Sequence, residues 1–262
     1  MESDSSAVRI AVLIDADNTS PKYAEAILDE LAKYGTPTIR RAYGDFTSPR
    51  MSGWSRELNT RAIRAIHQNA FTTGKNATDS ALIIDAMDLL YAGNVEAFAI
   101  VSSDSDFTSL ALRLQESGKT VYGLGRRRTP VSLQNACSRF IELEVLGTDG
   151  DDDDAGEDGG GDTAPQLNLQ SVLTKAVNAI ADDDGWASLS DVGSHLARSH
   201  PSFDPRSFGH AKLSSLVADQ PFLQTRDQTG RLGVALKGSP ARKSATKKAP
   251  AKRAARKTTK KA

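Results

Sequence analysis

Short apolar runs alternate with segments of helical periodicity up to residue 148, and this alternation limits the folds open to the chain. The runs VRIAVLID at 8–15 and VEAFAIVSS at 95–103 are continuous and rich in β-branched residues, which is typical of strands covered on both faces. Further strands are predicted at 36–46, 119–125 and 141–146, and helices at 20–35, 54–69, 78–93, 106–118 and 130–140. The order predicts an α/β fold, a Rossmann-like, mostly parallel sheet with helices on both faces.

Charge divides the chain, although its formal net charge is zero. Residues 149–162 hold eight acids and no base, and residues 237–262 hold eleven bases and no acid. Helical patterns at 167–183, 188–200 and 208–221, followed by a hairpin pattern at 222–237, predict a small α+β, winged-helix-like module. We therefore predict four segments: an α/β domain at 1–148, a disordered acidic linker at 149–165, the small domain at 166–237, and a disordered basic tail at 238–262.

The composition argues against two classes of protein. Cys137 is the only cysteine, so an internal disulfide is excluded, and no Cys/His cluster suggests structural zinc. The first residues lack a signal-peptide pattern, and no stretch reaches the roughly 18 consecutive apolar residues of a membrane span. We expect a cytoplasmic protein without membrane association, and the sequence gives no oligomeric state.

Two of the predicted strands end in the pattern Asp-x-Asp. Asp15 and Asp17 follow the first strand, and Asp104 and Asp106 follow the strand at 95–103. Residues two apart in an extended chain point to one side, and ligands of parallel sheets bind at the carboxyl edge. If the two strands are neighbours, up to four carboxylates meet there, and a divalent cation relieves their repulsion. Oxygen ligands without Cys or His favour Mg²⁺ or Mn²⁺.

A third source of acid is the helix predicted at 78–93. Asp79 lies in its first turn, whereas Asp85 lies about 240° further around the helix, so Asp79 is the better ligand candidate. Lys75 precedes this helix and is a candidate phosphate contact. A structural alternative is that acids beside helix starts act as N-caps, and Asp106 is the strongest instance of this alternative. Thr78 is the predicted cap of the helix.

The segments LIDADN, GKNATDSALIIDAMD and VSSDSDF resemble the NYN family, a branch of the PIN-like nucleases, over about 8–144. This resemblance implies a metal-dependent ribonuclease that hydrolyses RNA. We predict metal ligation and catalysis by Asp15, Asp79, Asp104 and Asp106, with support from Asp17, Asn18, Lys75, Asp85 and Ser102. Asp17 and Asp85 would act as ligands or position water, and Asn18 and Ser102 would orient the ligands.

The segment LSDVGSHLARSHPSFDPRSFGHAKLSSLV resembles the OST-HTH/LOTUS module. This resemblance implies an accessory RNA-binding domain. Its candidate contacts are Arg206, His210 and Lys212, which lie in a basic connection that leads into a helix.

The basic tail is a candidate for binding nucleic acid without base preference, through counterion release. The family pattern does not include this arm, so it suits DNA as readily as RNA. An alternative is that it folds back on the acidic linker. Its candidate contacts are Lys247, Lys248, Lys252, Arg253, Arg256 and Lys257.

Two other functions fit parts of the sequence. DADNT also satisfies the Asp-x-Asp-x-Thr motif of haloacid-dehalogenase-like phosphatases, in which Asp15 would be the nucleophile and Asp17 the acid. Against this, a helix is predicted to follow almost at once, which leaves little room for the flap of that family. The other alternative is a regulator that binds nucleic acid without cleaving it.

Overall fold

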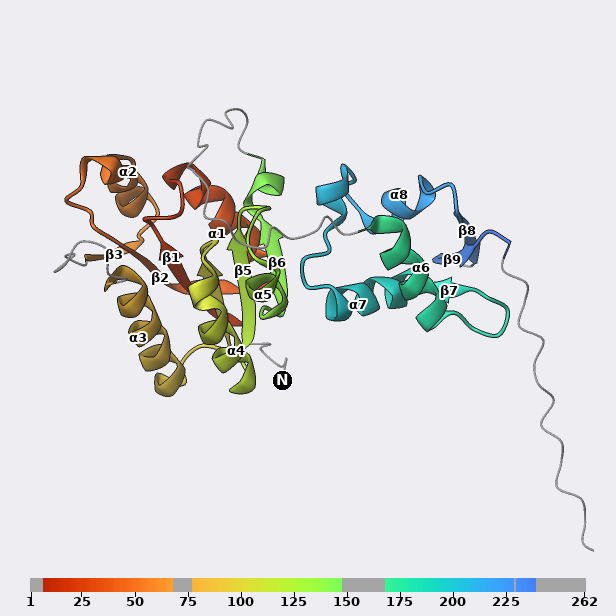
Figure 1. The fold of residues 1–262 in the computed structure, drawn as a ribbon, viewed down its shortest axis with the longest axis horizontal. Coiled ribbons are helices and arrows are strands. Elements are labelled where there is room, and N and C mark those ends of the chain that lie inside the picture. Colours follow the sequence, from red (N-terminus) through yellow and green to blue (C-terminus); the bar gives the residue numbers. More distant parts are fainter. Residues whose placement is uncertain (1–6, 68–76, 148–167, 229, 239–262) are drawn as a thin grey trace, which may run out of the picture.

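The computed structural model describes residues 7–67, 77–147, 168–228 and 230–238, which form two domains (Figure 1). The predicted linker at 149–165 lies outside the described residues, as does the tail apart from Gly238. Within the described ranges, no helix combines the length and apolar composition needed to cross a membrane.

The N-terminal domain is built on a six-stranded sheet with the strand order β3-β2-β1-β4-β5-β6, and every neighbouring pair is parallel. The predicted parallel α/β architecture is therefore confirmed. The order reverses between β1 and β4, so the two strands that precede the acidic pairs are neighbours. The strands are β1 (Arg9–Asp15), β2 (Thr36–Gly44), β3 (Arg64–His67), β4 (Ala97–Val101), β5 (Thr120–Gly125) and β6 (Arg139–Glu142).

Helices cover both faces of this sheet, because the side chains of each buried strand alternate between two apolar cores. Ala11 and Leu13 of β1 face the core under α3, α4 and α5, while Val12 and Ile14 face the core under α1 and α2. The helices are α1 (Ala24–Ala32), α2 (Ser52–Thr60), α3 (Ala77–Ala92), α4 (Thr108–Glu116) and α5 (Val131–Asn135).

The C-terminal domain packs three helices on a small antiparallel sheet with the strand order β7-β9-β8. Its core contains Leu173, Val192, Leu196 and Val217. The predicted three helices and hairpin are present. The elements are α6 (Leu169–Ile180), β7 (Ala187–Ser188), α7 (Leu189–Ser199), α8 (Leu213–Ala218), β8 (Leu223–Gln228) and β9 (Arg231–Leu236).

The helix predicted at 54–69 is wrong in its second half. Helix α2 ends at Thr60, and Ala62 has a φ of 50°, a left-handed conformation that a helix cannot continue through. Residues 64–67 then pair with β2 as the edge strand β3. Most of β3 is exposed, so it carries no apolar run that would mark it as a strand.

Several further boundaries differ from the predictions. Helix α5 stops at Asn135, and the strand that follows begins at Arg139 instead of 141. The remainder of the predicted strand at 141–146 is a 3₁₀ turn, Leu143–Leu146. The third helix of the small domain, predicted at 208–221, is only the six residues of α8.

Candidate metal centre

Three carboxylates meet at the carboxyl edge of the sheet. Asp79, in the first turn of α3, and Asp104 and Asp106, after β4, each offer an oxygen within 4.8 Å of the oxygens of the other two. Mg²⁺ and Mn²⁺ bind carboxylate oxygens, and oxygens this close together can contact one cation. The donor set therefore fits a hard divalent ion.

Asp79 shows how closely the acids approach one another. Burial raises the pKa of its carboxyl group to about 6, with further increases from the charges of Asp15, Asp104, Asp106 and Asp17. All five acids thus act on one small region, and a divalent cation placed there would offset their repulsion.

Asp15 is fully buried at the end of β1, beside this cluster. Its carboxylate accepts hydrogen bonds from Asn18 Nδ2 (2.8 Å), from the Asn18 backbone N–H (3.3 Å) and from Ser102 Oγ (2.7 Å). Burial raises the pKa of Asp15, and these hydrogen bonds partly oppose the increase. Ser102 Oγ also accepts from the backbone N–H of Asp104 (3.1 Å), so Asp15 is linked to the loop that carries Asp104.

Neither Asp-x-Asp pair lies in extended chain as predicted, because β1 ends at Asp15 before a turn at 16–18, and β4 ends at Val101 before a 3₁₀ turn at 105–107. Asp17 instead accepts a 3.0 Å hydrogen bond from Thr78 Oγ1. Thr78 lies inside the first turn of α3, so its predicted place as the helix cap is wrong. The cap after β4 is Asp104, which accepts from the Asp106 N–H (2.9 Å), and not Asp106.

Asp85 is directed to β2. Its carboxylate accepts hydrogen bonds from the Arg41 guanidinium and the Tyr43 hydroxyl. It is therefore bound by β2 side chains and is absent from the carboxylate group formed by Asp79, Asp104 and Asp106. Lys75 lies outside the described residues.

A cavity of about 590 Å³ adjoins the metal centre and was not predicted from the sequence. Its lining includes Asp17 and Asn18, of which Asn18 is hydrogen-bonded to Asp15, and Arg50 and Arg126 add positive charge. Arg126 directly follows β5. Three consecutive arginines, at 126–128, follow the strand predicted at 119–125, and they are the sequence signal that could have indicated a basic cavity at this edge of the sheet.

The predicted nucleic-acid contacts of the small domain have different surroundings. Lys212 lines a cavity of about 820 Å³ between α7, α8 and β9, together with Arg231. His210 Nε2 lies 3.7 Å from the Asp219 carboxylate. Arg206 is bound by carboxylates of both domains. The predicted tail contacts lie outside the described residues; they are Lys247, Lys248, Lys252, Arg253, Arg256 and Lys257.

Comparison with family models agrees with this arrangement of fold and site. The NYN domain model matches residues 9–144, which is more than half of the chain. This chain belongs to the NYN domain family. The OST-HTH/LOTUS domain model matches residues 164–234. The NYN match points to a nuclease, and the OST-HTH match points to RNA binding.

Three individual proteins are similar to parts of this chain. An uncharacterized protein from Methanocaldococcus jannaschii is 27% identical over 142 residues, and the match covers 52% of this chain and 55% of that protein, so this chain spans about half the length of that relative. A Vibrio parahaemolyticus protein of unknown function is 19% identical, with a TM-score of 0.46, over 54% of this chain and 96% of that structure. A solution structure of residues 175–257 of a Chromobacterium violaceum protein is 36% identical, with a TM-score of 0.25, over 32% of this chain and 95% of that structure.

Proposed function

We propose that the N-terminal domain of this NYN protein is a metal-dependent ribonuclease that hydrolyses RNA phosphodiester bonds. The observation that carries the proposal is the convergence of Asp79, Asp104 and Asp106, with Asp15 beside them, at the edge of the sheet where α/β proteins bind ligands. These four acids would hold Mg²⁺ or Mn²⁺. Such an ion, when bound, polarises a phosphoryl oxygen and lowers the pKa of a water molecule.

The remaining residues near the cluster have positioning roles in this proposal. Asn18 and Ser102 fix the carboxylate of Asp15, and Asp17 orients either a ligand or the attacking water. Lys75 contacts phosphate, and Asp85 supports the site through β2. Arg50 and Arg126 suit a neighbouring phosphate of the same RNA strand, because they line the adjoining cavity.

The haloacid-dehalogenase alternative requires Asp15 to attack phosphorus. Only residues 16–20 separate β1 from the 3₁₀ turn at 21–23 that leads into α1, which leaves little room for the flap of that family. Membership of the NYN family also favours hydrolysis at the metal centre.

The C-terminal domain would deliver RNA to this centre. Lys212 and His210 remain its proposed contacts, and the basic tail adds contacts to phosphate that suit DNA as well as RNA. Cys137 is buried, and burial raises the pKa of its thiol to about 12, which suits a packing role. Because Cys137 is the only cysteine of the chain, we also propose that the protein acts in the reducing cytoplasm.

The test uses the purified full chain with a labelled single-stranded RNA and a DNA of equal sequence, in Mg²⁺, in Mn²⁺ and in EDTA. We expect RNA cleavage only with metal, and at least a hundredfold loss in Asp104→Asn. Asp88→Asn is the matched control, because Asp88 is an exposed acid on α3 that lies away from the cluster. Binding without cleavage in every metal would instead support the non-catalytic regulator.

A further inference from the structure

Two buried carboxylates in the described residues have no part in the metal centre. Apart from Asp15, the buried acids are Glu30 of α1, at 3% exposed, and Asp204, at 4% exposed, in the turn between α7 and α8. They belong to different domains. Burying a carboxylate costs free energy unless the carboxylate is paired and hydrogen-bonded, so both acids require a partner.

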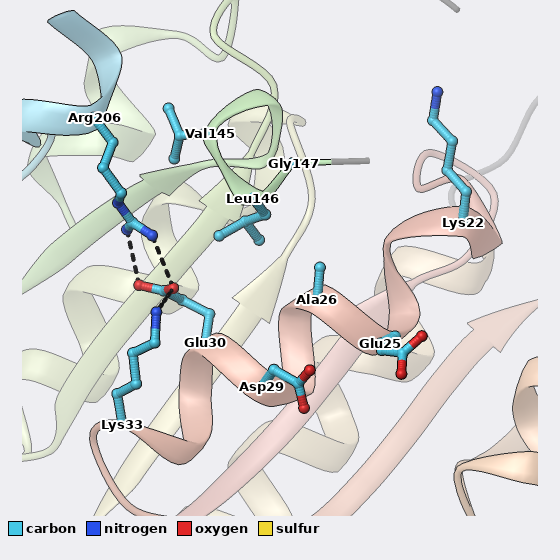
Figure 2. Close-up of a pocket in the computed structure, with 10 residues that line it drawn as sticks. All are labelled: Lys22, Glu25, Ala26, Asp29, Glu30, Lys33, Val145, Leu146, Gly147 and Arg206. Atoms are coloured by element: carbon cyan, nitrogen blue, oxygen red, sulfur yellow. Dashed lines mark hydrogen bonds and ion pairs between the residues drawn. The ribbon is translucent and has the colours of Figure 1, made fainter. Parts of the chain in front are cut away.

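The partner of both acids is Arg206. Its Nη1 and Nη2 donate to the two oxygens of Glu30 at 2.9 Å and 2.8 Å, a bidentate pair across the domain boundary (Figure 2). Its Nε and Nη2 also donate to Asp204, which holds the guanidinium in place within its own domain. Lys33 and Tyr34 also donate to Glu30, at 2.6 Å and 3.0 Å.

Further contacts surround this pair. Arg139 Nη2 lies 3.6 Å from Asp204, and Ser207 Oγ donates to Glu142 at 3.0 Å. The backbone N–H of Phe140 donates to the carbonyl of Pro201 at 2.9 Å. Phe140 lies in β6, the edge strand of the sheet, which Figure 1 shows next to the C-terminal domain, so this bond satisfies a backbone group that an open edge would leave unpaired.

The acidic member of the pair is strongly stabilised in its charged form. Burial alone would raise the pKa of Glu30, but the hydrogen bonds from Arg206, Lys33 and Tyr34 outweigh burial and lower the pKa to about 2. Hydrogen bonding to Asp204 and Glu30 raises the pKa of Arg206. Exposed ion pairs contribute little to stability, whereas removal of one partner from a buried pair leaves an uncompensated charge.

We infer that the OST-HTH domain docks within the same chain on a fixed face of the NYN domain, and that the ion pair between Arg206 and Glu30 holds the two domains together. We call this face the docking face; it consists of Glu30, Tyr34, Arg139, Glu142 and the backbone of Phe140. Arg206 therefore serves domain contact instead of RNA contact. None of the docking residues lines the cavity between α7, α8 and β9, so that cavity, with Lys212 and Arg231, stays available for nucleic acid while the domains are docked.

The test is a distance measurement between fluorophores on the two domains, without RNA or metal, so it is independent of nuclease activity. Arg56→Cys on α2 and Lys175→Cys on α6 replace exposed residues in the full chain, while Cys137 is buried and escapes labelling. We expect efficient energy transfer in this background. Arg206→Glu and Glu30→Arg should each lower the ratio of docked to undocked protein more than tenfold, because Arg206→Glu places a carboxylate beside Glu30 and Asp204, and Glu30→Arg places a cation beside Arg206 and Lys33.

Arg198→Glu is the matched control, because it makes the same charge change at an exposed position of the same domain and should leave the transfer efficiency unaltered. Circular dichroism verifies that each variant folds. If Arg206→Glu does not fold, Arg206→Gln replaces it as a neutral variant. Unchanged transfer in both single variants overturns the inference. Transfer between chains that carry only donor and chains that carry only acceptor also overturns it, because the contact would then be made between two copies.

Discussion

The hydroxyl of Ser102, after β4, donates a 2.7 Å hydrogen bond to the buried carboxylate of Asp15 at the end of β1. The two residues are 87 positions apart, and the parallel pairing of β1 with β4 brings them together. Because Ser102 also accepts from the Asp104 N–H, one hydroxyl fixes acids from two strands.

Replacing Ser102 by alanine should therefore disturb both folding and metal binding. Asp15 would lose one of its donors in a buried position, and we expect a loss of about 1 to 3 kcal/mol in the free energy of unfolding. The affinity for Mn²⁺, measured by calorimetric titration, should also fall. Ser109→Ala, on an exposed position of α4, should change neither quantity, and equal behaviour of the two variants would contradict the role given to Ser102.

Stability without metal should depend on pH through Asp79. Its pKa is about 6 in the folded chain and 3.8 ordinarily, so between pH 4 and 6 the folded state binds more protons than the unfolded state. The ionised side chain thus destabilises the metal-free protein above about pH 6, and this effect disappears as the pH falls towards 4.

We therefore expect Asp79→Asn in EDTA to be more stable than the unmodified chain at pH 7, by at least about 1 kcal/mol, since one pKa unit corresponds to about 1.4 kcal/mol. The difference should vanish near pH 4 in urea unfolding experiments. Mg²⁺ should stabilise the unmodified chain more than the variant. A difference that does not vary with pH would contradict a pKa of Asp79 raised by burial and by the neighbouring acids.

Asp85→Asn should lower stability while leaving the metal centre intact. The amide cannot accept from both Arg41 and Tyr43 in the way that a carboxylate does, which weakens the contact between α3 and β2. We expect a loss of about 1 to 3 kcal/mol in unfolding free energy and an Mn²⁺ affinity within about twofold of the original. A large loss of metal affinity with unchanged stability would show that Asp85 is itself a ligand.

Ending the chain at Gly238 should weaken nucleic-acid binding more than turnover at saturating RNA. If about six tail contacts reach phosphate, the slope of log K against log salt on duplex DNA should become less steep by about 5. Filter binding from 50 to 300 mM salt measures this slope. Unchanged affinity at low salt would mean that the tail does not contact nucleic acid.

The amino-acid sequence by itself determined the architecture of the N-terminal domain and the candidates for its acidic site. The apolar runs of β1 and β4 and the helical periods between them are local patterns, and each reports the burial of one element. The same patterns predicted that the acids at the strand ends lie near one another, because parallel strands place their carboxyl ends at one edge of the sheet.

Only the tertiary structure decided which of these groups meet. It added β3, an edge strand whose exposed residues carry no apolar signal, and it placed Asp79 with Asp104 and Asp106 while binding Asp85 to Arg41 and Tyr43. It also paired Arg206 with Glu30, 176 residues earlier in the chain. Side-chain partners so far apart in sequence are set by how the elements pack together, and local periodicity carries no information about that packing.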